Sequence, residues 1–471
     1  MRRSLPLAIV ATGIPVFMAT LDNLVVTTAL PVLHADLGAG IDELQWITNA
    51  YTLAFAALML FAGGLGDRLG RRRVYLAGIA LFTVASAAAG LSTDAAQLIA
   101  ARVVQGVGAA AITPLSLALL AGSVEERRRP LAIGVWGGIT GLGVALGPVI
   151  GGAVLQGWTW SGIFWLNVPV GVVALVLVAV ALPATAGSPV RLDVPGVLLA
   201  SSGLVALVWG VVRGNDAGWA SAEVLLSLAA ALVLLAGFVV RERRTASPLL
   251  PLRLFRSRSF SVVNAIALIF SFGAFGSVFL LSQFLQIVQG HDPLTAGLMT
   301  MPWTLAPMFV APLAGMAAGR VGTRTLIGAG LVLLAAGIGW LGATMTPAVA
   351  YGEQLPGYIA AGIGMGLVFA PLSTAVLAGT APADQAAASG TSSTLREVGV
   401  ALGIAVLTAV FSGAGGTLTP SGFTGAAQPA VLVGAAATAV AALLAALLPA
   451  GRTAPVPSTS SVPVAAEPVA V

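Results

Sequence analysis

Residues 114–122 (PLSLALLAG) return as residues 371–379 (PLSTAVLAG), with seven of nine positions identical, 257 residues further along the chain. Residues 143–147 (GVALG) return unchanged as 399–403, at an offset of 256 residues. A weaker third match has an offset of 252 residues. It pairs Gly63, Arg68 and Gly70 of one loop with Gly315, Arg320 and Gly322, respectively, of a later loop. Three matches in one order at nearly one offset indicate an internal duplication.

The composition is that of a membrane protein. Of the 471 residues, 58% are hydrophobic and 8% are charged, whereas a soluble globular chain carries roughly 25% charged residues. So few polar groups cannot cover so much apolar surface in water. The absence of cysteine excludes disulfides and thiolate metal sites, and two histidines, His34 and His291, are too few for a histidine-rich metal site. We therefore predict no metal and no cofactor.

The apolar residues fall into runs long enough to span a bilayer, which requires about 20 residues in a helix. Fourteen runs meet this length or come close to it: 7–33, 46–65, 74–91, 97–120, 131–154, 163–183, 194–212, 221–240, 259–286, 297–318, 325–344, 355–378, 396–412 and 429–449. The first run is too long for the core of a signal peptide and contains Asp22, so we expect a retained first helix. These runs predict an all-α integral membrane fold with 14 transmembrane helices.

The arginines predict the orientation, because loops rich in Lys and Arg stay in the cytoplasm. With the amino terminus inside, 20 of the 22 basic residues lie in cytoplasmic segments, Arg213 lies outside and Arg102 lies within a span. A single missed or extra helix would move every later loop to the other side of the membrane and spoil this count. The count therefore supports an even number of spans, with both termini in the cytoplasm. Exclusive use of arginine and 58 glycines are typical of a GC-rich bacterial genome. We expect a multi-pass protein of the bacterial cytoplasmic membrane.

The duplication predicts how the helices are grouped. It pairs the fourth span with the twelfth and the fifth with the thirteenth, and both pairs run in the same direction. We therefore expect two parallel six-helix bundles, in 1–185 and 246–450, two inserted helices in 186–245, and a disordered cytoplasmic tail in 451–471. Parallel halves of this kind are typical of transporters that bind their substrate between the halves.

Two ionisable residues, Asp22 and Arg102, lie well inside predicted spans rather than at their first residues. A charged carboxylate in the middle of a span, as Asp22 would be, costs about 2.5–3.5 kcal/mol, and such a residue is a functional candidate by default. Reversible protonation suits a carboxylate in this position, although a packing role with hydrogen bonds to Asn23 or Thr27 is an alternative. Arg102 lies early in the fourth span and could pair with Asp22, directly or through water. The alternative for Arg102 is a side chain that reaches the outer interface.

The loop between the second and third spans reads GGLGDRLGRRR over residues 63–73. Asp67 can pair with an arginine or with the amino terminus of a helix, and Gly70 permits a tight turn. We predict a cytoplasmic latch, meaning a contact that differs between two conformations, made by Asp67, Arg68, Gly70 and Arg71. A plain basic loop would explain the arginines but not Asp67.

The fifth span combines small residues with a proline. Gly143, Gly147 and Gly151 recur every four positions, which allows two helices to approach closely. Pro148 lacks a backbone donor and is expected to bend the helix, and Gly152 adds another small position. This spacing alone is equally compatible with two readings: ordinary close packing of two helices, and a fifth helix that rocks during transport.

The second half is predicted to be poorer in buried charge. At the positions that correspond to ionisable residues of the first half, the second half has uncharged residues. Asp22, Asp67 and Arg102 correspond to Gly276, Gly319 and Ile359, respectively. Glu397 opens the thirteenth span beside Arg396 and is expected to form a local ion pair. Charge handling is therefore expected in the first half.

Four of these segments resemble signatures of the major facilitator superfamily: residues 21–31, 63–73, 102–106 and 143–152. With fourteen spans, the chain is similar to the drug:proton antiporter branch over nearly its whole length. The glycine–proline segment resembles the mark of exporters rather than importers. The resemblance implies that Asp22 couples protons to substrate, that Arg102 is its partner in proton transfer, and that Asp67 belongs to the latch.

The chain departs from the family pattern in two respects. Leu24 and Thr27 stand where the family usually has Thr and Asn, so the hydrogen bonds around Asp22 are expected to differ. The predicted spans of the second half contain no carboxylate in mid-membrane, which favours neutral or monocationic lipophilic substrates.

These observations predict a proton-coupled antiporter that exports lipophilic drugs or antibiotics across the inner membrane by alternating access. Its partners would be protons, a lipophilic small molecule and the bilayer, with no nucleic acid, and it would work as a monomer. A proton-coupled importer of a small organic solute and a non-transporting membrane sensor are the alternatives. The fifth-span signature argues against the first and the buried charge against the second. With no nucleophile–base set and no P-loop in the sequence, neither an enzyme nor ATP-driven transport is expected.

Overall fold

The computed structural model describes residues 5–125, 129–184, 187, 193–215, 217–245, 248–250, 252–378, 380 and 385–449. Every regular element in these ranges is a helix, as predicted. The elements are α1 (Leu5–Leu37), α2 (Ile41–Leu69), α3 (Arg71–Gly90), α4 (Ala95–Ser123), α5 (Arg129–Gly157), α6 (Gly162–Trp165), α7 (Asn167–Ala181), α8 (Val194–Arg213), α9 (Ala222–Arg244), η2 (Leu252–Arg256), α10 (Arg258–Gln283), η3 (Phe284–Val288), α11 (Pro293–Val321), α12 (Thr323–Ala343), α13 (Tyr351–Leu377), α14 (Gln385–Gly413) and α15 (Pro420–Ala445).

The helices make the chain a multi-pass membrane protein. Among the described residues, twelve helices are long and apolar enough to cross a membrane, or up to fourteen if each of two bent pairs is one span. The predicted sixth run is covered by α6 and α7, and the ninth by α10 and η3. The predicted tail, 451–471, lies outside the described residues.

One predicted boundary is wrong in a way that matters for the site. We expected the thirteenth span to begin at 396, but α14 begins at Gln385. The added residues, 385–395, read QAAASGTSSTL, which is too polar to be recognised as part of a bilayer span. Ala388 in this stretch is fully buried in the hydrophobic core, so tertiary packing supports the helix through these polar residues.

The helix α5 is bent as its proline predicts. Its two parts, Val135–Gly143 and Leu146–Gly157, meet at 42°. Pro148 has no N–H to bond the carbonyl four residues earlier, which lies at this break. The other bent helix, α2, turns by 51° between Ile41–Met59 and Phe61–Leu69.

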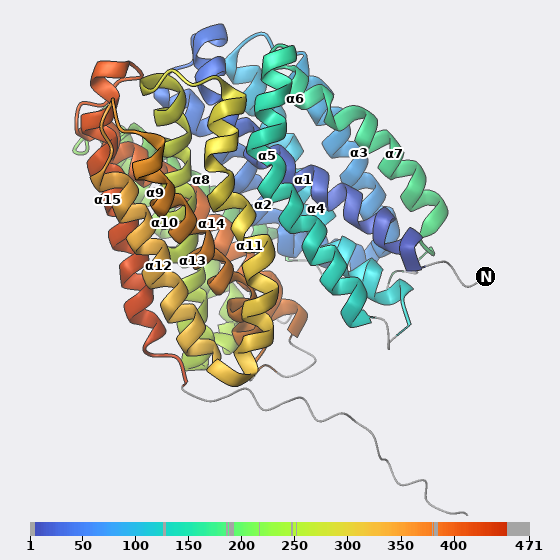
Figure 1. The fold of residues 1–471 in the computed structure, drawn as a ribbon. Helices are drawn as coiled ribbons and strands as arrows, with labels where there is room; N and C mark the ends of the chain where they lie inside the picture. The colour runs from blue at the N-terminus through green and yellow to red at the C-terminus, as the bar shows by residue number, and fades with distance from the viewer. Residues whose placement is uncertain are drawn as a thin grey trace, which may run out of the picture.

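The helices pack in two sets that meet along two main pairs of helices (Figure 1). In the amino-terminal set, α1 packs on α4, α5 and α7, and α4 also packs on α2 and α3. In the carboxy-terminal set, α10 packs on α14 and α15, while α13 packs on α11 and α12. The two sets meet where α5 contacts α11 and where α2 contacts α14. The helix α8 packs on α9 and also reaches α2 and α14, beside the second of these meeting places.

The weakest of the three sequence matches has a structural counterpart. Gly70 joins α2 to α3 with a φ of 98°, and Gly322 joins α11 to α12 with a φ of 92°. These are left-handed backbone conformations that favour glycine. In each case the glycine N–H bonds the carbonyl four residues earlier, Gly66 or Ala318. The same turn therefore occurs at equivalent places in the two sets.

Candidate functional site

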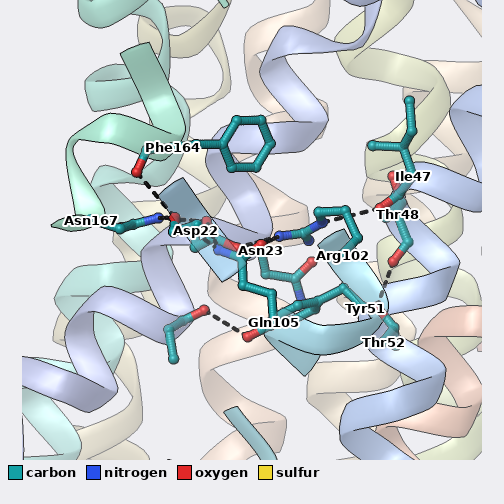
Figure 2. Close-up of polar contacts among 12 residues, drawn as sticks. Asp22, Asn23, Ile47, Thr48, Tyr51, Thr52, Arg102, Gln105, Phe164 and Asn167 are labelled. Atoms are coloured by element: carbon teal, nitrogen blue, oxygen red, sulfur yellow. Dashed lines mark hydrogen bonds and ion pairs between the residues drawn. The ribbon is translucent and has the colours of Figure 1, made fainter. Parts of the chain in front are cut away.

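Asp22 lies near the middle of α1 and is buried, with 2% of its surface exposed. Arg102 lies two turns into α4 and is 0% exposed, so its side chain does not reach an interface. The Arg102 Nη1 and the Asp22 Oδ2 form an ion pair, and the side chains point toward one another in Figure 2. The structure thus brings the two predicted residues together.

Two amides complete the shell around the carboxylate. The Gln105 Nε2 and the Asn167 Nδ2 donate to Asp22 Oδ1 at 2.9 and 2.7 Å. Both amides also donate to Ser86 Oγ, at 3.1 and 3.0 Å, and Ser86 donates to the Phe164 carbonyl at 3.0 Å. With Arg102, three donors surround an acceptor-only group, which is the arrangement a deprotonated carboxylate requires.

The guanidinium of Arg102 is held by α2 as well. Its Nε donates to the Ile47 carbonyl at 3.1 Å, and its Nη1 donates to Gln105 Oε1 at 2.8 Å. Its central carbon lies 4.2 Å from the centroid of the Tyr51 ring, and the Tyr51 hydroxyl donates to the Ala19 carbonyl at 3.1 Å. A cation above an aromatic face is stabilised by the ring electrons. Helices α1, α2 and α4 therefore converge on one charge pair.

The sequence reasoning missed Gln105 and Asn167. Gln105 follows Arg102 by three residues and so lies on the same face of α4, which was a usable signal. Asn167 opens α7, and nothing in its local sequence distinguishes it from any other helix-terminal asparagine. Asp22 makes no hydrogen bond to its alternative partners, Asn23 and Thr27, within the described residues; the Thr27 hydroxyl donates to the Asn23 carbonyl instead.

Arg102→Ala is expected to lower the free energy of unfolding by about 3–5 kcal/mol, because it leaves the Asp22 charge buried without its cation. Adding Asp22→Asn removes that uncompensated charge and should restore part of the loss. Thermal unfolding of the purified protein in detergent measures both effects. Losses that simply add in the double variant would contradict a charge pair.

The residues of the predicted latch lie around the turn at Gly70. Asp67 Oδ1 accepts from Arg71 Nε at 2.8 Å, and both side chains are 44% exposed. The Arg72 side chain donates to the Ala179 carbonyl near the end of α7, while Arg68 is exposed in the last turn of α2. The loop is therefore tied to its own turn and to α7.

The small residues of α5 face two different helices. A Cβ added at Gly143 would lie 3.1 Å from the Phe17 carbonyl oxygen of α1. One added at Gly147 would lie 2.6 Å from the Leu24 Cβ, and one at Gly151 would contact Val25, both also on α1. A Cβ at Gly152 would instead meet the backbone of Pro293 and Leu294 on α11. The predicted close approach is present, and it joins both sets of helices.

The contact between α5 and α11 is close from both sides. A Cβ added at Gly297 of α11 would lie 2.7 Å from the Pro148 carbonyl carbon, and the Gln156 Nε2 donates to Asp292 Oδ1 at 2.9 Å. Hydrogen bonds from Thr295 lower the pKa of the Asp292 carboxyl, so it is charged at neutral pH. Because backbone meets backbone here, a side chain at either glycine would push the helices apart.

A hollow of about 20 Å³ lies among α1, α5, α10, α11 and α13. Its lining carries hydroxyl groups and aromatic rings, among them Thr28, Ser282, Trp303 and Tyr358, and no charged residue. The Tyr358 hydroxyl has no hydrogen-bond partner within the described chain, so it is available as a donor. At this size the hollow holds about one water molecule, so it would have to widen to admit a small molecule, whose sites measure about 300–1,000 Å³.

One carboxylate was misplaced by the sequence reasoning. Glu397 follows the first residue of α14 by twelve positions, so it lies well inside the helix and not at its start. Among the described residues no salt bridge joins Glu397 to Arg396, whose guanidinium lies over the Phe369 ring, 5.5 Å from its centroid. Electrostatic attraction between the two neighbours remains. Neighbouring residues on a helix point in different directions, which explains the separation. The second set of helices therefore does contain a mid-span carboxylate.

Comparison with known proteins gives consistent matches. The model of the Major Facilitator Superfamily matches residues 13–404. The multidrug resistance protein Stp of Mycobacterium tuberculosis is 37% identical over 415 residues, covering 88% of this chain and 77% of that protein. The tetracenomycin C resistance and export protein of Streptomyces glaucescens is 36% identical, covering 90% and 79%. The cephamycin export protein CmcT of Amycolatopsis lactamdurans is 38% identical, covering 92% and 90%.

Solved structures with low sequence identity share the fold. The POT family transporter PepTSo matches with a TM-score of 0.66 and 15% identity, over 93% of this chain and 97% of that chain. The human organic anion transporter MFSD10 matches with a TM-score of 0.62 and 18% identity, over 93% and 99%.

Proposed function

The chain belongs to the major facilitator superfamily, and we propose that it is a proton-coupled antiporter that exports lipophilic drugs or antibiotics across the bacterial inner membrane by alternating access. It is a transporter and not an enzyme. We propose that all fourteen apolar runs span the membrane, with both termini in the cytoplasm. We also propose that the protein works as a monomer, with the two sets of helices as its six-helix bundles and α8 and α9 inserted between them.

The observation that carries the proposal is the buried pair of Asp22 and Arg102. Protonation of Asp22 would remove its charge, weaken its attraction to Arg102, and leave the guanidinium to Gln105, the Ile47 carbonyl and the Tyr51 ring. A proton can therefore change the contacts among α1, α2 and α4. In the cycle we propose, a proton from outside binds Asp22 as the substrate leaves, and release of that proton to the cytoplasm resets the site.

Alternating access requires contacts that open on one side and close on the other. The contact of α5 with α11 lies at the ends of these helices that the proposed topology assigns to the outside, and it would close the outer path. The predicted latch residues Asp67, Arg68, Gly70 and Arg71 would act at the cytoplasmic side. The two contacts lie at opposite ends of the amino-terminal set, as a rocking motion requires.

The substrate class follows from the hollow beside α1. Its uncharged lining of hydroxyls and rings suits a lipophilic compound with a few hydrogen-bonding groups, and Tyr358 would donate to one of them. The relatives named for multidrug resistance, tetracenomycin C export and cephamycin export support an antibiotic-like compound as cargo.

Everted membrane vesicles containing the protein test the proposal. When respiration acidifies the vesicle interior, a lipophilic dye should accumulate inside, and a protonophore should release it. Accumulation that survives the protonophore would exclude proton coupling. Movement of the dye outward under the same gradient would instead support the importer.

Asp67→Asn is expected to slow transport about tenfold, the size of a typical coupling between distant sites. Stability should fall by less than about 0.5 kcal/mol, because an exposed i,i+4 ion pair contributes no more than that. Initial transport rates and thermal unfolding measure the two effects. Asp94→Asn, which keeps a helix-capping residue at an exposed position, is the control. Equal rates for Asp67→Asn and wild type would remove Asp67 from the latch.

A further inference from the structure

Two acidic residues are buried where α8 begins and α9 ends. Asp193 comes directly before α8 and Glu242 lies in the last turn of α9, with 3% and 4% of their surfaces exposed. Glu242 follows the apolar run 221–240, so the pair lies at the end of the inserted helices that the proposed topology assigns to the cytoplasm. Buried charges require a cation or hydrogen-bond donors, so the partners of each carboxylate oxygen are informative.

One oxygen of each carboxylate has partners. The Asp193 Oδ1 accepts from the Gly196 N–H at 3.1 Å and from the Arg241 Nε at 2.8 Å. The Glu242 Oε2 accepts from the Leu250 N–H at 2.8 Å. These bonds tie together the start of α8, the end of α9 and the residues that lead to η2.

The other oxygen of each carboxylate is buried without a partner. Asp193 Oδ2 and Glu242 Oε1 have no hydrogen bond within the described part of the chain. Both are directed at one place, because a Cβ added at Gly196 would lie 2.6 Å from the first and 3.0 Å from the second. Two deprotonated carboxylates can only accept hydrogen bonds, so they would repel one another and leave both oxygens unsatisfied. A single proton held between them satisfies both.

The charges around the pair leave one negative charge without a counter-charge. Arg241 forms an ion pair with Asp193, and the helix packed against α9, α8, has no other ionisable residue before Arg213 at its far end. The remaining charged groups on α9 and η2 near this end are exposed arginines, which stay protonated: Arg243, Arg244, Arg253 and Arg256. A change of charge at this place therefore belongs to the two carboxyls.

Burial raises the pKa of the Glu242 carboxyl from 4.5 to about 7, the bond from Leu250 opposes this rise, and the negative charge of Asp193 adds to it. A carboxyl of this kind exchanges its proton near neutral pH.

We propose that Asp193 and Glu242 share one proton and form a proton-binding site on the inserted helices, separate from Asp22 on α1. A proton supplies the one positive charge that the pair lacks and the one donor that its two free oxygens need. With the proton bound, the start of α8 is held to the end of α9, and without it two like charges push these ends apart. Because α8 also contacts α2 and α14, the pH on this side of the membrane would act on the place where the two sets of helices meet. The site goes beyond the proposed export function and does not rest on it.

Thermal unfolding of the purified full-length protein in detergent, recorded as a function of pH, tests the proposal. The folded protein holds the Glu242 proton to a higher pH than the unfolded chain does, so this site should lose stability as the pH rises from about 4.5 to about 7 and change little above. Glu242→Gln imitates the protonated state, since its amide donates to Asp193 and its oxygen still accepts from Leu250. Its melting temperature relative to wild type should therefore rise by at least about 2 °C between about pH 5 and about pH 7, and then stay constant.

A second variant supplies the donor from the other side. Asp193→Asn keeps a helix-capping residue and donates to Glu242, so it should show the same reduced dependence on pH. Glu223→Gln, at an exposed position at the other end of α9, is the matched control and should keep the wild-type pH profile. Profiles parallel to that of wild type in both amide variants would overturn the shared proton. Equal losses of stability at every pH in both variants would assign the two residues a packing role only and would also overturn it.

Discussion

Asp22→Asn is expected to abolish movement of substrate driven by a proton gradient, with a loss of at least about 100-fold and substrate affinity within a few fold of wild type. The physical reason is that asparagine cannot gain or lose a proton, so Arg102 no longer has a partner whose charge changes during the cycle. The amide keeps a similar size, and its oxygen still accepts hydrogen bonds from Gln105 and Asn167. The fold around α1 should therefore persist, although the unpaired Arg102 charge should lower the free energy of unfolding by about 3–5 kcal/mol, as Arg102→Ala does.

Proteoliposomes with an imposed pH gradient measure this effect, with dye binding recorded on the same preparations. Asp36→Asn is the matched control, because Asp36 lies on the same helix but is exposed near its end. Wild-type transport by Asp22→Asn would mean that the proton binds elsewhere. Loss of both binding and transport would indicate a structural role for Asp22.

Gly297→Ala is expected to slow transport at least about tenfold by keeping the outer contact open. The added methyl group would meet the backbone of Pro148 and Val149, and backbone cannot move aside as a side chain can. Overpacking of this kind costs about 1–3 kcal/mol, and that cost falls only on the conformation in which α5 and α11 touch. A shift of this size changes the ratio of two conformations by about 5–150-fold.

Thiol labelling tests the direction of this shift, because the natural chain has no cysteine. Ser282→Cys places a reporter in the hollow, and a membrane-impermeant reagent is added from the outside. Labelling should increase when Gly297→Ala is combined with the reporter. Gly141→Ala on α5, where an added Cβ meets nothing within 4 Å, should leave labelling and transport unchanged. Reduced outside labelling in Gly297→Ala would contradict the assignment of this contact to the outer side.

The helices could be predicted from the sequence because bilayer spans depend on length and hydrophobicity alone. The same rule failed at α14, since residues 385–395 are polar and are held in the helix by packing rather than by hydrophobicity. That failure hid Glu397, which was assigned to the start of a span. Asp22 and Arg102 could be identified from the sequence as functional candidates because charged residues within a span are rare.

The rest of the charge shell could not be predicted. Gln105 and Asn167 are neutral residues, and their importance depends on which helices converge on Asp22, which a single sequence does not specify. The glycines of α5 were correctly predicted to allow close approach. Which helix each one approaches was open, and only the structure separates Gly152, against α11, from Gly147, against α1.

The most direct test of the central claim, that substrate and protons move in opposite directions, needs no variant. Proteoliposomes containing the wild-type protein and a lumenal pH indicator are loaded with Nile red and diluted into dye-free buffer, without an initial pH gradient. Antiport predicts that the lumen becomes more acidic as the dye leaves, and that a protonophore removes the signal. A lumen that becomes more alkaline would mean that protons leave with the dye, and a lumen of constant pH during rapid dye efflux would mean that transport is not coupled to protons.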